Sequence, residues 1–88
     1  DDIVTDMAEL TRRAEPHFRR VKNLKDGEDY LKAGYWFKNG RFSLPESIGI
    51  AGESLILFYD YYEIGPRPVG ETTIAIPLDE VKDIIKHR

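Results

Sequence analysis

The densest run of apolar and aromatic residues in the chain is LILFYDYY, which occupies residues 55–62. Branched and aromatic side chains favour extended structure, so this run predicts a strand. Turn-forming residues flank it: residues 51–54 read AGES, and residues 63–69 read EIGPRPV, with one glycine and two prolines. The sequence therefore predicts a central strand between a tight turn and a stiff loop.

Further strands are predicted on both sides of this run. Residues 71–76 alternate along the chain and predict the last strand, and residues 47–50 predict a weaker one. Upstream, residues 35–38 and 41–44 flank an Asn-Gly pair, which is typical of a two-residue hairpin turn because both turn positions need a positive φ. We therefore expect four to five strands in an antiparallel meander.

Helices are predicted at the two ends of the chain. Residues 3–24 carry apolar side chains at spacings of three and four, namely Ile3, Met7, Leu10, Ala14, Phe18, Val21 and Leu24. Pro16 lies inside this pattern and lacks an N–H group, so we expect a kink or two helices that meet near Glu15.

Two shorter helices complete the prediction. Asp26 is expected to cap a second helix that Gly34 ends. Pro77 is expected to start a closing amphipathic helix that contains Leu78, Val81, Ile84 and Ile85. The resulting fold class is α+β: an antiparallel meander sheet of four to five strands packed with N-terminal helices and a C-terminal helix.

Length and composition limit the class of protein. The chain has 88 residues, 41% of them hydrophobic, which suits one globular domain over residues 1–88. No cysteine is present, which excludes disulfides, thiolate metal sites and cysteine nucleophiles. Because the chain starts at Asp1 and shows no signal-peptide pattern, we expect it to be a processed or excised fragment.

The charges are distributed unevenly. Residues 1–44 hold nine basic and eight acidic residues, a sum of +1, whereas residues 45–88 hold four and eight, a sum of -4. The first segment concentrates Arg12, Arg13, Arg19, Arg20, Lys22 and Lys25. We interpret this cluster as a solvated helix face, since nucleic-acid-binding domains usually carry a net basic charge. The acidic second half favours a basic partner.

No motif for catalysis or metal binding is recognisable. His17 and His87 are the only histidines and lack the spacing of zinc ligands, so we expect no metal and no cofactor. Asp60 and Glu63 are interpreted as exposed charges at a strand end rather than an acid–base pair. The serines stand in no nucleophile motif.

The candidate binding residues lie around the loop over residues 63–69. On a strand, Tyr59 and Tyr61 would share one face and Tyr62 the other, so one set is expected in the core and the other at a partner. Two prolines stiffen the loop, which makes it either a recognition element or a structural corner. We name Tyr61, Tyr62, Glu63 and Arg67 as candidate binding residues.

A family resemblance rests on FYDYYEIGPRPVG at residues 58–70 and TTIAIPL at residues 72–78. These motifs resemble the C-terminal extracytoplasmic domain of the RsiV-like family. That domain occurs in anti-sigma-V-type factors, in bacterial lipoproteins and beside the catalytic part of PdaC-type peptidoglycan deacetylases. The resemblance extends over residues 28–86 and implies structural roles for Gly65, Pro66, Gly70 and Pro77. The chain departs from the family's usual residues at positions 67–68.

The resemblance implies a non-catalytic binding or sensory module of a bacterial cell-envelope protein. It implies that residues 1–88 are the C-terminal part of a longer protein with an extracytoplasmic location and membrane anchoring through a preceding segment. It also implies recognition of lysozyme or a cell-wall component. The alternative is an accessory domain of a peptidoglycan-modifying enzyme such as a deacetylase. An independent hydrolase, a nucleic-acid partner and membrane contact by this segment itself are not expected.

Overall fold

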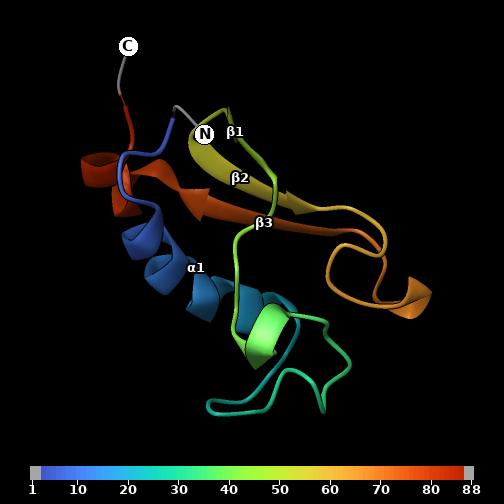
Figure 1. The fold of residues 1–88 in the computed structure, drawn as a ribbon. Coiled ribbons are helices and arrows are strands. Elements are labelled where there is room, and N and C mark those ends of the chain that lie inside the picture. Colours follow the sequence, from blue (N-terminus) through green and yellow to red (C-terminus); the bar gives the residue numbers. More distant parts are fainter. Residues whose placement is uncertain (1–2, 87–88) are drawn as a thin grey trace.

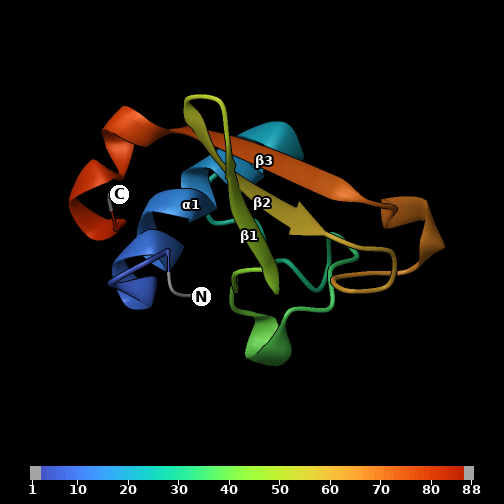
Figure 2. The ribbon, with the colours of Figure 1, turned by 90° about the horizontal axis from the view of Figure 1, so that it is seen from above.

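The structure is a computed structural model that describes residues 3–86, and it has an α+β fold. One α-helix packs against one face of a three-stranded antiparallel sheet (Figures 1 and 2). The regular elements are α1 (Met7–Val21), β1 (Ser47–Ala51), β2 (Ser54–Tyr59) and β3 (Thr72–Pro77). Single 3-10 turns occur at Lys38–Gly40, Arg67–Val69, Leu78–Glu80 and Lys82–Ile84. The predicted fold class is confirmed, but within the described residues the sheet has three strands rather than four or five.

Helix α1 is continuous through its proline. The Asp6 side chain caps it by accepting a hydrogen bond from the N–H of Glu9 at 3.0 Å. The helix buries Leu10, Ala14 and Phe18. Pro16 is exposed, so the Arg12 carbonyl that it leaves without a helical donor is on the solvent side, where water can satisfy it. The alternative of two helices meeting near this proline is therefore wrong.

The sheet follows the order β1-β2-β3, with each strand antiparallel to the next. The turn predicted over residues 51–54 is confirmed: Ala51 pairs with Ser54, so Gly52 and Glu53 are the two residues that connect β1 to β2. The face toward α1 carries the buried side chains of β2 and β3, which are Leu55, Leu57, Tyr59, Thr72, Ile74 and Ile76. The strand predictions over residues 47–50 and 71–76 are confirmed to within a residue, whereas the central strand ends at Tyr59.

The hairpin predicted around the Asn-Gly pair is wrong. Both residues of the pair have a positive φ, 58° and 69°, as the sequence predicted, but the flanking runs form no strand ladder. Trp36 instead donates its N–H to the carbonyl of Ile64 at 2.7 Å. Phe37 and Phe42 are buried against Phe18. Burial of these two rings in the shared core replaces the pairing of the two runs.

The predicted second helix is a single turn that begins three residues later than expected. The Asp29 carboxylate, not that of Asp26, accepts the N–H groups of Leu31 at 2.8 Å and Lys32 at 3.2 Å. Gly34, with a φ of 98°, ends the turn as predicted.

The predicted C-terminal helix is also absent from the described residues. Pro77 is the last residue of β3, and two 3-10 turns follow it. The chain then returns to the N-terminal segment: Thr5 donates to the Ile84 carbonyl at 2.8 Å, and Lys86 donates to that of Ile3 at 2.7 Å. This pairing requires extended backbone at the point where the amphipathic pattern predicted a continuing helix.

A cluster of aromatic rings forms one part of the core. The ring of Phe18 lies at the centre, with five other rings between 5.3 and 6.0 Å from it: Tyr30, Tyr35, Phe37, Phe42 and Tyr59. Tyr59 donates its hydroxyl to the Ser43 carbonyl at 2.5 Å, and burial raises the pKa of this phenol. The cluster joins α1, the irregular segment before β1 and the sheet.

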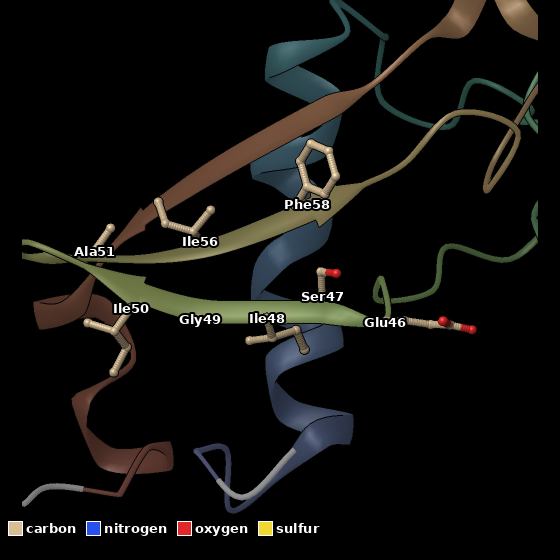
Figure 3. Close-up of a pocket in the computed structure, with 8 residues that line it drawn as sticks. All are labelled: Glu46, Ser47, Ile48, Gly49, Ile50, Ala51, Ile56 and Phe58. Atoms are coloured by element: carbon tan, nitrogen blue, oxygen red, sulfur yellow. The ribbon is translucent and has the colours of Figure 1, made fainter.

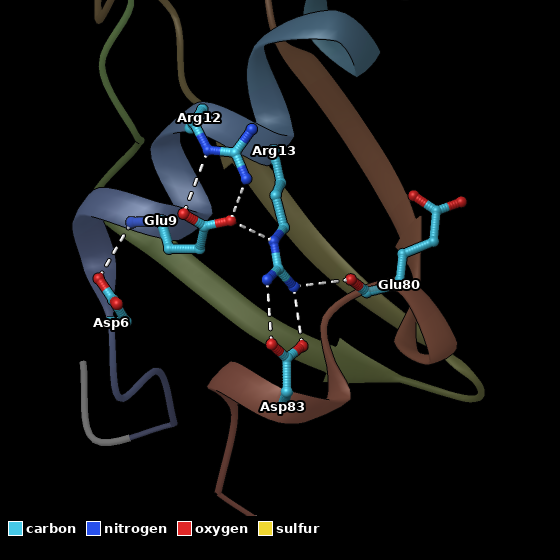
Figure 4. Close-up of polar contacts among 6 residues, drawn as sticks. All are labelled: Asp6, Glu9, Arg12, Arg13, Glu80 and Asp83. Atoms are coloured by element: carbon cyan, nitrogen blue, oxygen red, sulfur yellow. Dashed lines mark hydrogen bonds and ion pairs between the residues drawn. The ribbon is translucent and has the colours of Figure 1, made fainter.

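A polar network joins α1 to the C-terminal turns (Figure 4). The Arg13 guanidinium donates to both carboxylate oxygens of Asp83, at 2.8 and 3.0 Å, and to the Glu80 carbonyl at 3.0 Å. Its Nε donates to Glu9 at 2.7 Å, and Arg12 donates to the same carboxylate. The network therefore connects residues that are about seventy positions apart in the chain.

This network predicts a loss of stability in acid. Hydrogen bonds from Arg12 and Arg13 lower the pKa of Glu9 to about 2, and the hydrogen bond from Arg13 lowers the pKa of Asp83. Both groups bind protons more readily in the unfolded chain, so stability is expected to fall as the pH drops from about 5 toward 2. Urea midpoints measured from pH 7 to pH 2 test this. The Arg13→Met variant should flatten the curve, and Arg20→Met on the same helix should not; equal acid slopes in both variants would contradict the prediction.

Candidate functional site: an aromatic corner at one end of the sheet

The candidate binding residues lie in the segment over residues 60–70, which we call the corner. It joins β2 to β3 and projects beyond one end of the sheet (Figures 1 and 2). Tyr61 and Tyr62 belong to this corner and not to the strand, so the prediction that they lie on opposite strand faces is wrong. Both are exposed, at 51% and 55%, whereas Tyr59 is in the core.

The first turn of the corner has an unusual backbone. Tyr62 has a φ of 63°, in the left-handed region that costs a bulky residue on the order of 1 kcal/mol or more. The Glu63 N–H donates to the Asp60 carbonyl at 3.1 Å, and the Asp60 carboxylate accepts the N–H of Tyr61 at 2.7 Å. These bonds hold the turn in a shape that leaves both tyrosine rings outside the core.

The Glu63 carboxylate holds the corner against β1. One oxygen accepts the N–H of Asp60 at 2.8 Å, and the other accepts the N–H of Glu46, just before β1, at 3.0 Å. Both oxygens are therefore used within the domain. The Asp60 and Glu63 pair is part of a hydrogen-bonded turn, and contact between Glu63 and a partner stays a prediction.

The residues of the resembling motif occupy geometrically restricted positions. Gly65 is buried, and a Cβ added to it would lie 2.6 Å from Cγ2 of Val69 and 3.2 Å from the Gly34 carbonyl oxygen. Pro66 accepts the N–H of Val69 at 2.9 Å. Gly70 has φ 67° and ψ -162°, a region that is essentially open to glycine alone. This geometry is compatible with the structural roles that the resemblance implies.

Trp36 is a further exposed aromatic residue and is not among the candidate binding residues predicted from the sequence. Its N–H donates to the Ile64 carbonyl at 2.7 Å, which places it beside the corner, and its side chain is 55% exposed. Its neighbours Tyr35 and Phe37 are buried. The alternation of side chains along an extended segment could have indicated this exposure. If the rings of Tyr35 and Phe37 are buried in the core, the side chain of the residue between them points outward. We call the four exposed residues in and beside the corner, Trp36, Tyr61, Tyr62 and Arg67, the aromatic corner.

The charges around the aromatic corner are predominantly negative. The segment over residues 60–71 contains three acidic residues, Asp60, Glu63 and Glu71, and one basic residue, Arg67, so its charges sum to -2. Arg67 and Pro68 are both exposed at the outer part of the corner. The corner therefore combines exposed aromatic rings with an excess of acidic residues, which suits a partner that presents basic groups.

The remaining candidate chemistry lies elsewhere. His17 Nε2 is 2.9 Å from a carboxylate oxygen of Glu80, and His87 lies outside the described residues. Among residues 3–86, no group of three or more histidine, aspartate or glutamate side chains is placed to hold a metal ion. Over the same residues, no helix has the length and apolar character needed to cross a bilayer.

A polar hollow of about 590 Å³ lies between α1 and residues 27–42. Inside it, Tyr30 donates its hydroxyl to Glu15 at 2.6 Å, and the Arg19 guanidinium lies 4.5 Å from the centre of the Tyr30 ring. Arg19 also donates to the carbonyls of Lys25 and Glu28. These polar groups satisfy one another, so the hollow does not present convergent free groups to a ligand.

Comparisons with known proteins connect this fold to a family without an assigned function. A family model described as a protein of unknown function, DUF3298, matches residues 1–79. The chain is similar to the 2.30 Å crystal structure of a DUF3298 family member from Bacteroides fragilis NCTC 9343, with a TM-score of 0.76 and 22% sequence identity. The similarity covers 99% of this chain and 35% of that chain. No curated protein sequence matched. At this identity, the likeness to the solved structure concerns the fold alone.

Proposed function

Since the chain belongs to the DUF3298 family, whose function is unknown, we propose its function from the geometry of the aromatic corner. The domain is a non-catalytic module that binds a partner protein. The observation that carries this proposal is the exposure of three large aromatic side chains in and beside one hydrogen-bonded corner: those of Tyr61 and Tyr62 within it, and that of Trp36, whose backbone N–H is bonded to it.

Exposed aromatic rings on an ordered backbone favour binding for two reasons. Tryptophan and tyrosine are enriched among the residues that dominate interface energies, since each buries a large area with few rotatable bonds. The hydrogen bonds of Glu63 and Trp36 hold the backbone of the corner before any partner arrives. Ordering that is already present in the free domain lowers the entropy lost on binding.

The charge of the corner supports a basic partner. The sum of -2 over residues 60–71 and of -4 over residues 45–88 would attract cationic surfaces. The resemblance of the motifs to RsiV-like domains supports a sensory role in an extracytoplasmic cell-envelope protein that a preceding segment anchors. The same resemblance supports lysozyme, a basic protein, as the partner to test first.

A second candidate uses the same surface for a sugar polymer. Exposed tryptophan and tyrosine rings also stack on the apolar faces of sugar rings, so the aromatic corner suits a glycan strand as well. The domain would then be an accessory domain of a peptidoglycan-modifying enzyme such as a deacetylase. Titration with soluble peptidoglycan fragments separates this candidate from a protein-binding module.

Calorimetric titration with a c-type lysozyme tests the proposal directly. We expect binding that persists at physiological salt, and at least a tenfold loss of affinity in both Trp36→Ala and Tyr61→Ala, the size expected of dominant interface residues. Met7→Ala is the matched control, because Met7 is an exposed apolar residue (44%) at the start of α1. Its affinity should stay within twofold of the unmodified domain.

Three results would contradict this proposal. Binding that disappears at physiological salt would be surface-charge attraction alone. Equal losses of affinity for lysozyme in Met7→Ala and Tyr61→Ala would show that the aromatic corner is not the binding site. Binding of peptidoglycan fragments without binding of lysozyme, weakened by Trp36→Ala, would replace the protein partner with the glycan.

A further inference from the structure

Strand β1 has a free backbone edge. It lies at the end of the sheet order and pairs with β2 alone. Across residues 3–86, residues 47–51 make no backbone–backbone hydrogen bond to any other segment. The two-residue turn makes Ala51 and Ser54 a hydrogen-bonded pair, and such pairs alternate along an antiparallel ladder. The N–H and C=O groups of Ile48 and Ile50 therefore point away from β2.

This edge lacks the features that usually prevent pairing with another strand. The sequence SIGIA contains no charged residue and no proline, and its register with β2 runs without a bulge. Ile50 is 46% exposed. A free edge with these properties is a template for an added strand.

The side chains along β1 suit an extended segment with alternating apolar residues. A shallow hollow of about 450 Å³ runs along the strand. In Figure 3, Ile56 and Phe58 of β2 project on one side of the sheet, and Ile48 and Ile50 project on the other. Gly49 leaves open space, since no atom lies within 4 Å of the position that a Cβ would take. An added strand would thus find apolar contacts on both of its faces.

Charges at the two ends of β1 indicate the chemistry of the occupant. Glu46 precedes the strand and Glu53 follows it, and both are exposed. In an antiparallel pairing of two copies of this chain, Glu46 of one copy would approach Glu53 of the other, and each copy carries a net charge of -3. Like charges thus disfavour self-pairing, whereas a segment with a basic residue at each end would be attracted.

We propose that β1 is a docking edge that takes up, as a fourth strand, an extended segment of a partner protein with alternating apolar residues and a Lys or Arg at each end. The Glu63 carboxylate, which already binds the Glu46 N–H, limits this pairing to residues 47–51. The proposal goes beyond the function assigned to the aromatic corner and does not depend on it.

The test measures binding of the fluorescently labelled peptide KVTITVK to the 88-residue chain by anisotropy. Ile50→Pro removes one outward N–H and should weaken binding at least tenfold. Ala75→Pro is the matched control on the opposite sheet edge: by the same alternation, Ala75 of β3 points its N–H outward, and it is also exposed. The affinity of Ala75→Pro for KVTITVK should stay within twofold of that of the unmodified chain.

A charge reversal keeps the test informative if Ile50→Pro alters the fold. The double variant with Glu46→Lys and Glu53→Lys should bind KVTITVK at least tenfold more weakly and should gain binding of EVTITVE. Absence of peptide binding up to millimolar concentration would overturn the proposal, as would equal losses in the two proline variants. Sedimentation that shows a dimer dissociated by Ile50→Pro would also overturn it, because the occupant would then be a second copy.

Discussion

Replacement of Phe18 by alanine is expected to lower the free energy of unfolding by about 3–5 kcal/mol. Phe18 is fully buried. Its ring packs against five other aromatic rings, four from the irregular segment over residues 30–42 and one from β2. The substitution would remove the buried ring of Phe18 together with its contacts to the surrounding rings, and it would leave a cavity in their place. Domains of this size have a total stability of about 4–13 kcal/mol, so the expected loss is a large fraction of the stability of this domain.

Urea unfolding followed by circular dichroism checks this expectation. Phe18→Leu fills part of the cavity and should lose less stability than Phe18→Ala. Val21→Ala is the control on the same helix, because Val21 is exposed, and it should change stability by less than about 0.5 kcal/mol. A loss below about 1 kcal/mol in Phe18→Ala would show that the aromatic cluster is not the centre of the core.

Replacement of Gly65 by alanine is expected to cost about 1–3 kcal/mol, because the new methyl group would overpack the corner. The Cβ would lie 2.6 Å from Cγ2 of Val69, and the Gly34 carbonyl oxygen would lie 3.2 Å away on backbone that cannot rotate aside. The φ of Gly65 is outside the left-handed region, so the expected loss is steric rather than conformational.

A double-mutant cycle with Val69→Ala tests the steric cause. Shortening Val69 removes the closest contact, so Gly65→Ala should cost less in the Val69→Ala background than in the unmodified chain. Gly49→Ala is the control, since its Cβ would meet no atom within 4 Å, and it should change stability by less than about 0.5 kcal/mol. Strict additivity of the two corner substitutions would contradict the proposed clash.

Those features of the candidate site that depend only on neighbouring residues in the chain could be predicted from the sequence. The prolines and glycine of residues 63–69 predicted a loop, and the density of tyrosines before it predicted exposed aromatic residues. The exposure of Trp36 could have been predicted from alternation, but its place beside the corner could not, because it depends on a hydrogen bond to Ile64, twenty-eight positions along the chain. The engagement of the Glu63 carboxylate with the Glu46 N–H is non-local in the same way.

The sequence by itself determined the elements whose stabilising interactions lie close together in the chain. The apolar stripe of α1, the two-residue turn at Gly52 and Glu53, and the alternation of β3 each need only neighbouring residues to be recognised. For that reason these elements occur within a few residues of their predicted bounds.

Only the tertiary structure decided the outcome where local preference and burial conflict. The Asn-Gly pair kept its predicted backbone, yet Phe37 and Phe42 joined the core around Phe18 instead of a hairpin. The C-terminal segment forms backbone hydrogen bonds with Thr5 and Ile3 instead of the predicted helix. Turn and helix preferences amount to about 1 kcal/mol or less per residue, whereas burial of an aromatic ring contributes about 1.5–3 kcal/mol, so the packing of distant segments prevailed.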